Sequence, residues 1–209
     1  MIALNNQWQQ FATDFENRNN YVVGKSEIDR IKTRLSKFYG TGHVLELGCG
    51  NGTYTKVMAD NAQSVTATDV SREMLNVCQK RLCDCDNVKT QLADGFNLPY
   101  HDNSFDTLFM ANLLHVVPEQ NKLLKECHRV LKPFGQVIVM SVTMYKMSLI
   151  NRAKLLYRYH KTYGKKPTHS TVLTPDLCQS LFNASGFELK SQELLGTNTH
   201  ALLCQGIKR

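Results

Sequence analysis

The feature that most constrains the fold is a short apolar segment that runs directly into three closely spaced glycines. Residues 43–47 are mostly apolar with a glycine on either side, as is typical of a central strand in a parallel sheet. Gly48, Gly50 and Gly52 follow, and residues 53–59 then resemble the start of a helix. Glycines at such a junction let backbone N–H groups approach a ligand closely. The segment predicts an α/β fold that holds a nucleotide-like ligand at this turn.

The spacing of the glycines limits which nucleotide-like ligands the turn can be expected to bind. A dinucleotide site needs the pattern G-x-G-x-x-G, whereas here the third glycine comes one residue early and gives G-x-G-x-G. This spacing argues against NAD and FAD.

Strands and helices are predicted to alternate after the glycine turn, which indicates a parallel sheet with right-handed crossovers. We expect strands at 64–69, 88–92, 105–112 and 136–142, and helices at 72–82 and 119–131.

The two ends of the chain add further elements. Residues 4–38 are expected to form two helices broken near Asn19-Asn20, with Trp8, Phe11 and Phe15 on one face. A basic helix at about 144–163 precedes a second helix, for which Thr174 suits the N-cap and Pro175 the first helical position. Strands at 187–194 and 200–207 are expected to close the chain as a hairpin at the sheet edge.

Length and composition predict one domain, because 209 residues with 42% apolar content suit a single buried core. We divide it into an N-terminal helical lid, a cofactor-binding core, a basic helical insertion, and a C-terminal helix with the edge hairpin. These parts span residues 1–40, 43–142, 143–173 and 174–209.

The chain is predicted to be cytoplasmic. No apolar run approaches the roughly 18 residues of a membrane span, and the N-terminus lacks the apolar core of a signal peptide. Seven cysteines form no regular framework, which suits a reducing compartment. Cys83-Asp84-Cys85 could be a metal clip, but no second Cys/His pair lies at ligand spacing, so a polar turn is preferred and no metal is expected.

Positive charge is concentrated in one segment. The chain has 25 basic and 18 acidic residues, a net charge of +7. Between Cys127 and Pro175 there are nine basic residues and no acidic one. This segment therefore carries the whole excess.

Two aspartates follow predicted strands on the side where a ligand would bind. Asp69 ends the second strand, where an acid can accept hydrogen bonds from ribose hydroxyls, although such an aspartate often only caps the next helix. Asp94 follows the third strand and could accept from an adenine amino group, with Phe96 and Met74 on either side of the ring. The alternative is an ordinary Asp-Gly turn beside core aromatics.

Together these motifs resemble those of class I S-adenosylmethionine-dependent methyltransferases, most closely the small-molecule type that includes quinone-biosynthesis enzymes. The residues that carry the resemblance are Glu46–Gly52, Asp69, Asp94, Ser104–Leu108 and Glu126–Gly135. The resemblance implies a doubly wound, Rossmann-like sheet of seven strands, mostly parallel with an antiparallel last strand. Phe134 departs from the family, which usually has glycine there.

The resemblance also implies a role for each motif. Glu46 would attract the α-ammonium group of S-adenosylmethionine, Gly48 and Gly50 would lie against its methionine portion, and Gly52 would permit a tight entry into the helix. The full set expected to bind the cofactor is Glu46, Gly48, Cys49, Gly50, Asn51, Gly52, Asp69, Val70, Met74, Asp94, Gly95, Phe96, Asn112 and Leu113.

Catalytic residues are less well defined. His115 follows the fourth strand and is the first candidate for a base, because imidazole titrates near neutrality; the alternative is a structural histidine with a satisfied hydrogen bond. Tyr21 could reach the site from the N-terminal lid. A base is needed only if the acceptor arrives protonated, since transfer is an in-line displacement that depends mainly on alignment.

The acceptor is expected to be a small aromatic, apolar or anionic molecule with an O, N, S or C nucleophile, covered by the basic insertion as an amphipathic helical cap. Amino methylation of nucleic-acid bases usually goes with an Asn/Asp-Pro-Pro-aromatic motif, and here that place has Asn112-Leu113-Leu114-His115. Nucleic acid is therefore disfavoured. The alternative is a binding module, or a methyltransferase, that docks RNA, an anionic membrane or a protein through residues 143–166. The sequence does not indicate an oligomeric state.

Overall fold

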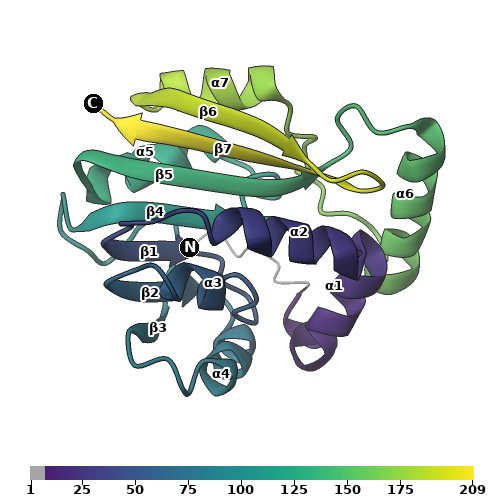
Figure 1. The fold of residues 1–209 in the computed structure, drawn as a ribbon, viewed down its shortest axis with the longest axis horizontal. Helices are drawn as coiled ribbons and strands as arrows, with labels where there is room; N and C mark the ends of the chain where they lie inside the picture. Colours follow the sequence, from purple (N-terminus) through teal and green to yellow (C-terminus); the bar gives the residue numbers. More distant parts are fainter. Residues whose placement is uncertain (1–7) are drawn as a thin grey trace.

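The computed structural model describes residues 8–209, which form a seven-stranded sheet in the order β3-β2-β1-β4-β5-β7-β6 (Figure 1). Its strands are β1 (His43–Leu47), β2 (Ser64–Asp69), β3 (Val88–Leu92), β4 (Phe105–Ala111), β5 (Leu131–Thr143), β6 (Phe187–Leu195) and β7 (His200–Lys208). Strand β7 pairs antiparallel with β5 and β6, and the others run in one direction. The predicted mixed sheet with an antiparallel last strand is confirmed.

Helices cover both faces of the sheet, because successive side chains of each strand point to opposite faces. Leu45 and Leu108 pack with α5 and α7, whereas Val44 and Phe109 pack with α2, α3 and α4. The helices are α1 (Phe15–Val23), α2 (Lys25–Leu35), α3 (Thr55–Ala59), α4 (Arg72–Arg81), α5 (Gln120–Val130), α6 (Leu149–Tyr163) and α7 (Pro175–Ala184), with a 3-10 helix η1 (Gln9–Asp14) before them.

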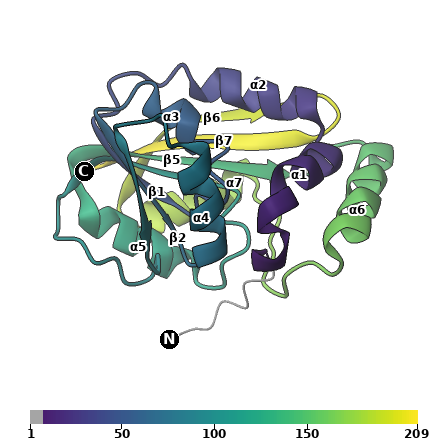
Figure 2. The same cartoon turned by 90° about the horizontal axis from the view of Figure 1, so that it is seen from below.

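Helices α1 and α6 lie side by side beyond one end of the sheet (Figures 1 and 2). A separate apolar cluster joins them, in which Val22 and Val23 of α1 pack against Met147 and Leu155. Arg18 also donates a hydrogen bond to the carbonyl of Thr162 at 3.1 Å. These contacts hold the basic helix against the N-terminal elements.

The N-terminal helices divide at Gly24 and not at Asn19-Asn20, which lie inside α1. The predicted break was wrong because Gly24 has a φ of 101°, a conformation that an L-residue rarely adopts. Residues 4–7 of the predicted helical segment lie outside the described part of the chain. Trp8, Phe11 and Phe15 gather around Tyr163 of α6, with ring centroids 5.1, 5.3 and 6.2 Å away.

Side-chain caps fix the starts of three helices. The hydroxyl of Thr174 accepts from the N–H of Leu177, and Pro175 occupies the first turn, as predicted. Ser71 caps α4 in the same way, and Ser148 caps α6, which therefore begins at Leu149, five residues later than predicted from the sequence. No helix within residues 8–209 is both long and apolar enough to span a bilayer.

Strand β5 begins at Leu131, earlier than predicted, and contains an irregularity before Gln136. Phe134 lies in this stretch with a φ of 62° and is 82% exposed. That conformation favours glycine, which accounts for the family's usual residue at this position.

Candidate active site

A cavity of about 670 Å³ opens at the carboxyl ends of the parallel strands. It lies where the strand order reverses between β1 and β4, which is the usual ligand crevice of a doubly wound sheet. The glycine turn, β2 and residues 93–96 line one side. Trp8, helices α1 and α6, and residues 165–172 line the other.

The glycine turn presents backbone to the cavity. Gly48 and Gly50 have φ values of 67° and 54°. A Cβ on Gly48 would lie 3.1 Å from Cδ1 of Leu113, whereas one on Gly50 would meet nothing within 4 Å and would project into open space. The turn is anchored to β2, because the N–H of Cys49 donates to the carbonyl of Thr68 at 2.9 Å.

Asp69 is held by the backbone on two sides. Its Oδ2 accepts from the N–H of Gly50 at 2.9 Å, and its Oδ1 accepts from the N–H of Ser71 at 2.8 Å. Burial raises the pKa of this carboxyl even though these N–H groups act in the opposite direction. Asp69 therefore connects the glycine turn to the start of α4 and lines the cavity between them.

Glu46 is a buried carboxyl without a full set of partners. It is 1% exposed, lines the cavity, and its Oε2 accepts no hydrogen bond from residues 8–209. Burial, together with the nearby charge of Asp69, raises its pKa to about 8. A cation with N–H donors is the kind of ligand that would satisfy this oxygen.

The side of the cavity that holds the glycine turn also contains Asp94, Gly95 and Phe96, together with Met74 and Val70. Oδ1 of Asp94 accepts from the N–H of Phe96 at 2.9 Å, so the carboxylate is fixed at the cavity edge. Met74 is buried, whereas Val70 is 42% exposed. Apolar side chains with one fixed acceptor suit a flat heterocycle that carries an amino group.

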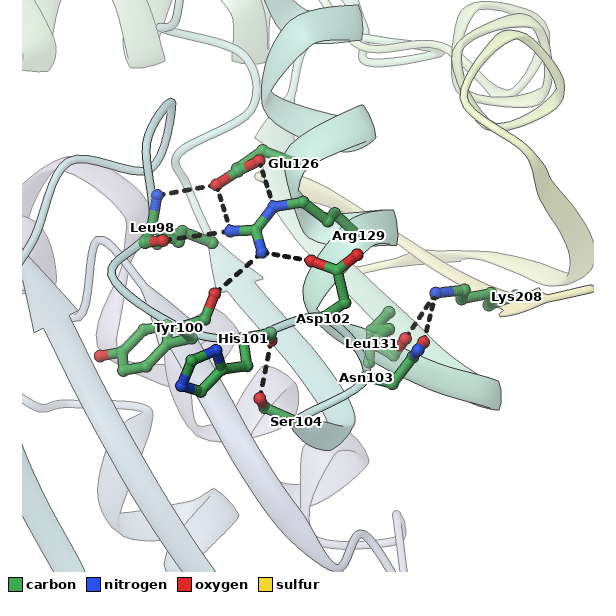
Figure 3. Close-up of polar contacts among 10 residues, drawn as sticks. All are labelled: Leu98, Tyr100, His101, Asp102, Asn103, Ser104, Glu126, Arg129, Leu131 and Lys208. Carbon is green, nitrogen blue, oxygen red and sulfur yellow. Dashed lines mark hydrogen bonds and ion pairs between the residues drawn. The ribbon is translucent and has the colours of Figure 1, made fainter.

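A loop behind this wall is clamped to α5 by Arg129 (Figure 3). The guanidinium donates to both carboxylate oxygens of Glu126 at 2.8 and 3.0 Å, to Asp102 at 2.7 Å, and to the carbonyls of Leu98 and Tyr100 at 3.1 and 2.8 Å. Glu126 in turn accepts from the N–H of Leu98 at 2.8 Å. All five donors of Arg129 are used, which fixes residues 98–102 next to the cavity wall.

His115 lies in the other half of the cavity. Its Nδ1 is 2.7 Å from Oγ of the buried Ser141, and that hydroxyl is 3.3 Å from the carbonyl of Val142. Burial, and to a lesser extent the Lys166 ammonium, lower the pKa of His115 to about 4. When the Ser141 hydroxyl donates to the carbonyl of Val142, its oxygen accepts from Nδ1–H of His115. In this tautomer Nε2 carries no proton and can accept a hydrogen bond.

Of the cofactor residues predicted from the sequence, all but Gly52 line the cavity. Gly52 packs against α4, where a Cβ would lie 2.9 Å from Sγ of Cys78. Asn112 and Leu113 lie between the two halves, and Oδ1 of Asn112 accepts from the N–H of Val142 at 2.8 Å. Tyr21 is outside the lining and 45% exposed, with its carbonyl bonded to Arg158.

Several residues of the site were not predicted from the sequence. Tyr54 lines the cavity with a buried hydroxyl that has no partner within residues 8–209, and its position right after the glycine turn was an available signal. Ser141, the partner of His115, gave no signal, because the pairing depends on β5 lying beside β4. The aromatic and basic residues of the acceptor half were predicted only as parts of the N-terminal lid or the basic insertion, without individual roles: Trp8, Phe15, Tyr159, Tyr163, Lys165, Lys166 and His169.

Residues 45–139 match the profile of a methyltransferase domain. The chain is 33% identical over 189 residues to the demethylmenaquinone methyltransferase of Staphylococcus aureus, covering 87% of this chain and 78% of that one. It is 34% identical to that of Clavibacter sepedonicus but spans only 56% of its length. Among solved structures, a SAM-dependent methyltransferase of Thermotoga maritima has a TM-score of 0.76 at 20% identity, covering 97% of this chain and 98% of that one.

Proposed function

Because the chain belongs to the class I S-adenosylmethionine-dependent methyltransferases, we propose that it transfers a methyl group from this cofactor to a small molecule in the same cavity. The observation that carries the proposal is Glu46. Glu46 lines a cavity next to the glycine backbone of residues 48–50, and one of its buried carboxylate oxygens has no hydrogen-bond partner within residues 8–209. That combination fits the methionine portion of the cofactor, with its ammonium group at Glu46 and its aliphatic chain packed against the glycine backbone.

The other cofactor residues fit the same ligand. We assign the ribose hydroxyls to Asp69, which already lies at the end of β2 with its orientation fixed by backbone N–H groups. The adenine amino group is assigned to Asp94, and the ring to the space between Met74 and Phe96. Cys49, Asn51, Val70, Gly95, Asn112 and Leu113 complete the lining.

The cofactor supplies an electrophilic methyl carbon on a sulfonium. The protein then has to hold an acceptor in line with that carbon and exclude water, and alignment alone can lower the barrier by about 7–11 kcal/mol. We assign to Nε2 of His115 the task of accepting a hydrogen bond from the acceptor and taking its proton as the methyl group arrives. A weakly basic imidazole suffices, because the acceptor becomes strongly acidic once it is alkylated.

We infer that the acceptor is a lipophilic aromatic ring of the quinol kind, because relatives of this chain are named demethylmenaquinone methyltransferase. Support comes from Trp8, Phe15, Tyr159 and Tyr163, which line that half of the cavity. Lys165 and Lys166 also line the acceptor half. The acidic residues that line the cavity, Glu46, Asp69 and Asp94, all lie in the cofactor half. The two ammonium groups would therefore stabilise the ring oxygen as its proton passes to His115.

Calorimetry with S-adenosylmethionine and S-adenosylhomocysteine tests the cofactor assignment. We expect both to bind, and more weakly to Glu46→Gln than to the unchanged protein. Incubation with methyl-labelled cofactor and reduced quinones, followed by mass spectrometry, tests transfer. If neither compound bound, the proposal would be refuted. Binding of S-adenosylmethionine without transfer to any acceptor would favour a binding module.

We propose that the protein works in the cytoplasm. All seven cysteines are free, and five of them are buried. Free thiols are typical of a reducing compartment.

A further inference from the structure

We propose that the exposed face of α6 docks the protein on an anionic lipid bilayer. The inner face of this helix is occupied, since Leu155 packs against α1 and Tyr159 and Tyr163 line the cavity. The outer face carries Leu149, Ile150 and Tyr157, which are 80%, 69% and 65% exposed. Large apolar side chains this exposed on one helix indicate an interaction surface.

The exposed residues form a continuous stripe. Leu149, Ala153 and Tyr157 recur every four residues, and Ile150 lies beside them, so all four share one side of the helix. Lys154 and Lys161 border the stripe and are exposed, and Lys146 lies just before the helix. An apolar stripe flanked by cations is the pattern of a helix that lies in a membrane interface.

Lys146, Lys154 and Lys161 are exposed and available to an external partner. Residues 143–166 contain seven basic and no acidic residues. Within residues 8–209 none of the seven forms an ion pair, whereas nine basic residues elsewhere do. Anionic lipid headgroups would supply the missing counter-charge while the acyl region takes up the apolar stripe.

Other occupants fit less well. A second copy would bring two strongly basic helices together with no carboxylate between them, which is repulsive. An RNA backbone would pair with the lysines but would leave Leu149 and Ile150 in water, because phosphates offer no apolar contact. Only a surface that is both anionic and apolar satisfies both sets of side chains.

Helix α6 lies between the proposed membrane surface and the acceptor half of the cavity. The helix exposes the stripe on one side and lines the acceptor half of the cavity on the other, and residues 165–172, which follow it, also line that half. A lipophilic acceptor could thus pass from the bilayer to the cavity past α6. This route rests on the proposed function, but the docking itself does not.

Flotation with unilamellar vesicles tests the docking without any methyl transfer. We expect binding to vesicles of phosphatidylcholine mixed with phosphatidylglycerol, little binding to phosphatidylcholine alone, and weakening between about 0.05 and 0.5 M salt. Leu149→Glu with Ile150→Glu should lower partitioning at least about tenfold, because it removes apolar burial and adds repulsion. The matched control is Tyr39→Glu with Phe134→Glu, which changes two similarly exposed large residues outside α6 and should bind normally.

A second pair of variants distinguishes the effect of the cations at α6 from the effect of the protein's net charge. Neutralising Lys146, Lys154 and Lys161 to Gln should weaken partitioning about a hundredfold, at about fivefold per cation near an anionic surface. The control neutralises Lys37, Lys80 and Lys89, which are exposed elsewhere and change the net charge equally. Circular dichroism and thermal unfolding check that every variant folds.

Three outcomes would overturn the proposal. The first is failure of the unchanged protein to bind anionic vesicles, and the second is equal loss in both lysine variants. The third is concentration-dependent dimerisation, or RNA binding, that the Leu149/Ile150 variant abolishes while vesicle binding stays absent. Absence of methyltransferase activity would leave the docking result unaffected, so the two proposals can fail separately.

Discussion

Glu46 behaves as an acid held above its ordinary pKa by the fold. Its carboxyl is buried next to Asp69, and its pKa of about 8 means that it carries a proton at neutral pH while no cation is present. An ammonium group placed against the unpaired Oε2 would favour the ionised form and lower that pKa. Cofactor binding should therefore release a proton.

The first prediction follows from the sign of this shift. Affinity for S-adenosylhomocysteine should rise about tenfold per pH unit below pH 8 and level off above it, because deprotonation of Glu46 no longer opposes binding there. Calorimetry in buffers of different ionisation enthalpy should show about one proton released at pH 7. Glu46→Gln should bind more weakly and lose both effects, while Glu188→Gln, far along the chain in β6, should keep them. A pH-independent affinity in the unchanged protein would contradict this role.

The second prediction concerns Ser141, which we assign as a positioning residue for His115. Ser141→Ala removes the 2.7 Å contact to Nδ1, so the ring loses its fixed orientation and kcat should fall about tenfold. His115→Asn should lower kcat about a hundredfold, since proton transfer by a side chain contributes at least that much. Binding of S-adenosylhomocysteine should not change in either variant.

The matched variant for this pair is Ser141→Thr, which keeps the hydroxyl and should restore most of the activity. If Ser141→Ala retained full kcat, or if Thr failed to rescue it while the protein stayed folded, the orienting role would be refuted.

At the scale of elements, the sequence predicted those whose signals are local. The strand before the glycine turn, the Thr174-Pro175 helix start and the terminal hairpin each depend on neighbouring residues, and all three are confirmed. The start of β5 was missed because Lys132-Pro133-Phe134-Gly135 resembles a turn, yet this stretch belongs to the strand and interrupts its register. Such an irregularity is set by pairing with β4, and the local sequence pattern of β5 carries no information about that pairing.

Arg129 shows how one side chain can fix a whole connection. The third prediction is that Arg129→Lys lowers the free energy of unfolding by about 2–3 kcal/mol, because a lysine has three donors and cannot reproduce the planar contacts to Glu126, Asp102 and the loop carbonyls. Denaturant titration measures this. Arg30→Lys is the control, since Arg30 is half exposed and makes one ion pair, so its cost should stay below about 1 kcal/mol. Equal effects would mean that the clamp adds nothing.

The cavity as a whole is assembled from segments that are far apart in the sequence. Its cofactor half lies close to the glycine turn, Asp69 and Asp94, each of which follows a strand, so a sequence pattern could indicate it. Its acceptor half depends on Trp8 meeting Tyr163 and on residues 165–172 reaching His115, whose carbonyl accepts from the N–H of Thr171 at 2.8 Å. Contacts between segments that are far apart in the sequence leave no local signal, which is why that half was predicted only as a cap.

Ligand binding should therefore protect distant segments together, which is the fourth prediction. At a hundred times its Kd, S-adenosylhomocysteine should raise the free energy of unfolding by about 2.7 kcal/mol. Hydrogen exchange should slow most in the segments 48–54, 69–74 and 94–96, which supply lining residues to the cofactor half, and little in β6 at the far sheet edge. The same ligand concentration should protect Glu46→Gln much less. Protection confined to residues 165–172, with none at the glycine turn, would place the cofactor in the other half of the cavity and reverse the assignment.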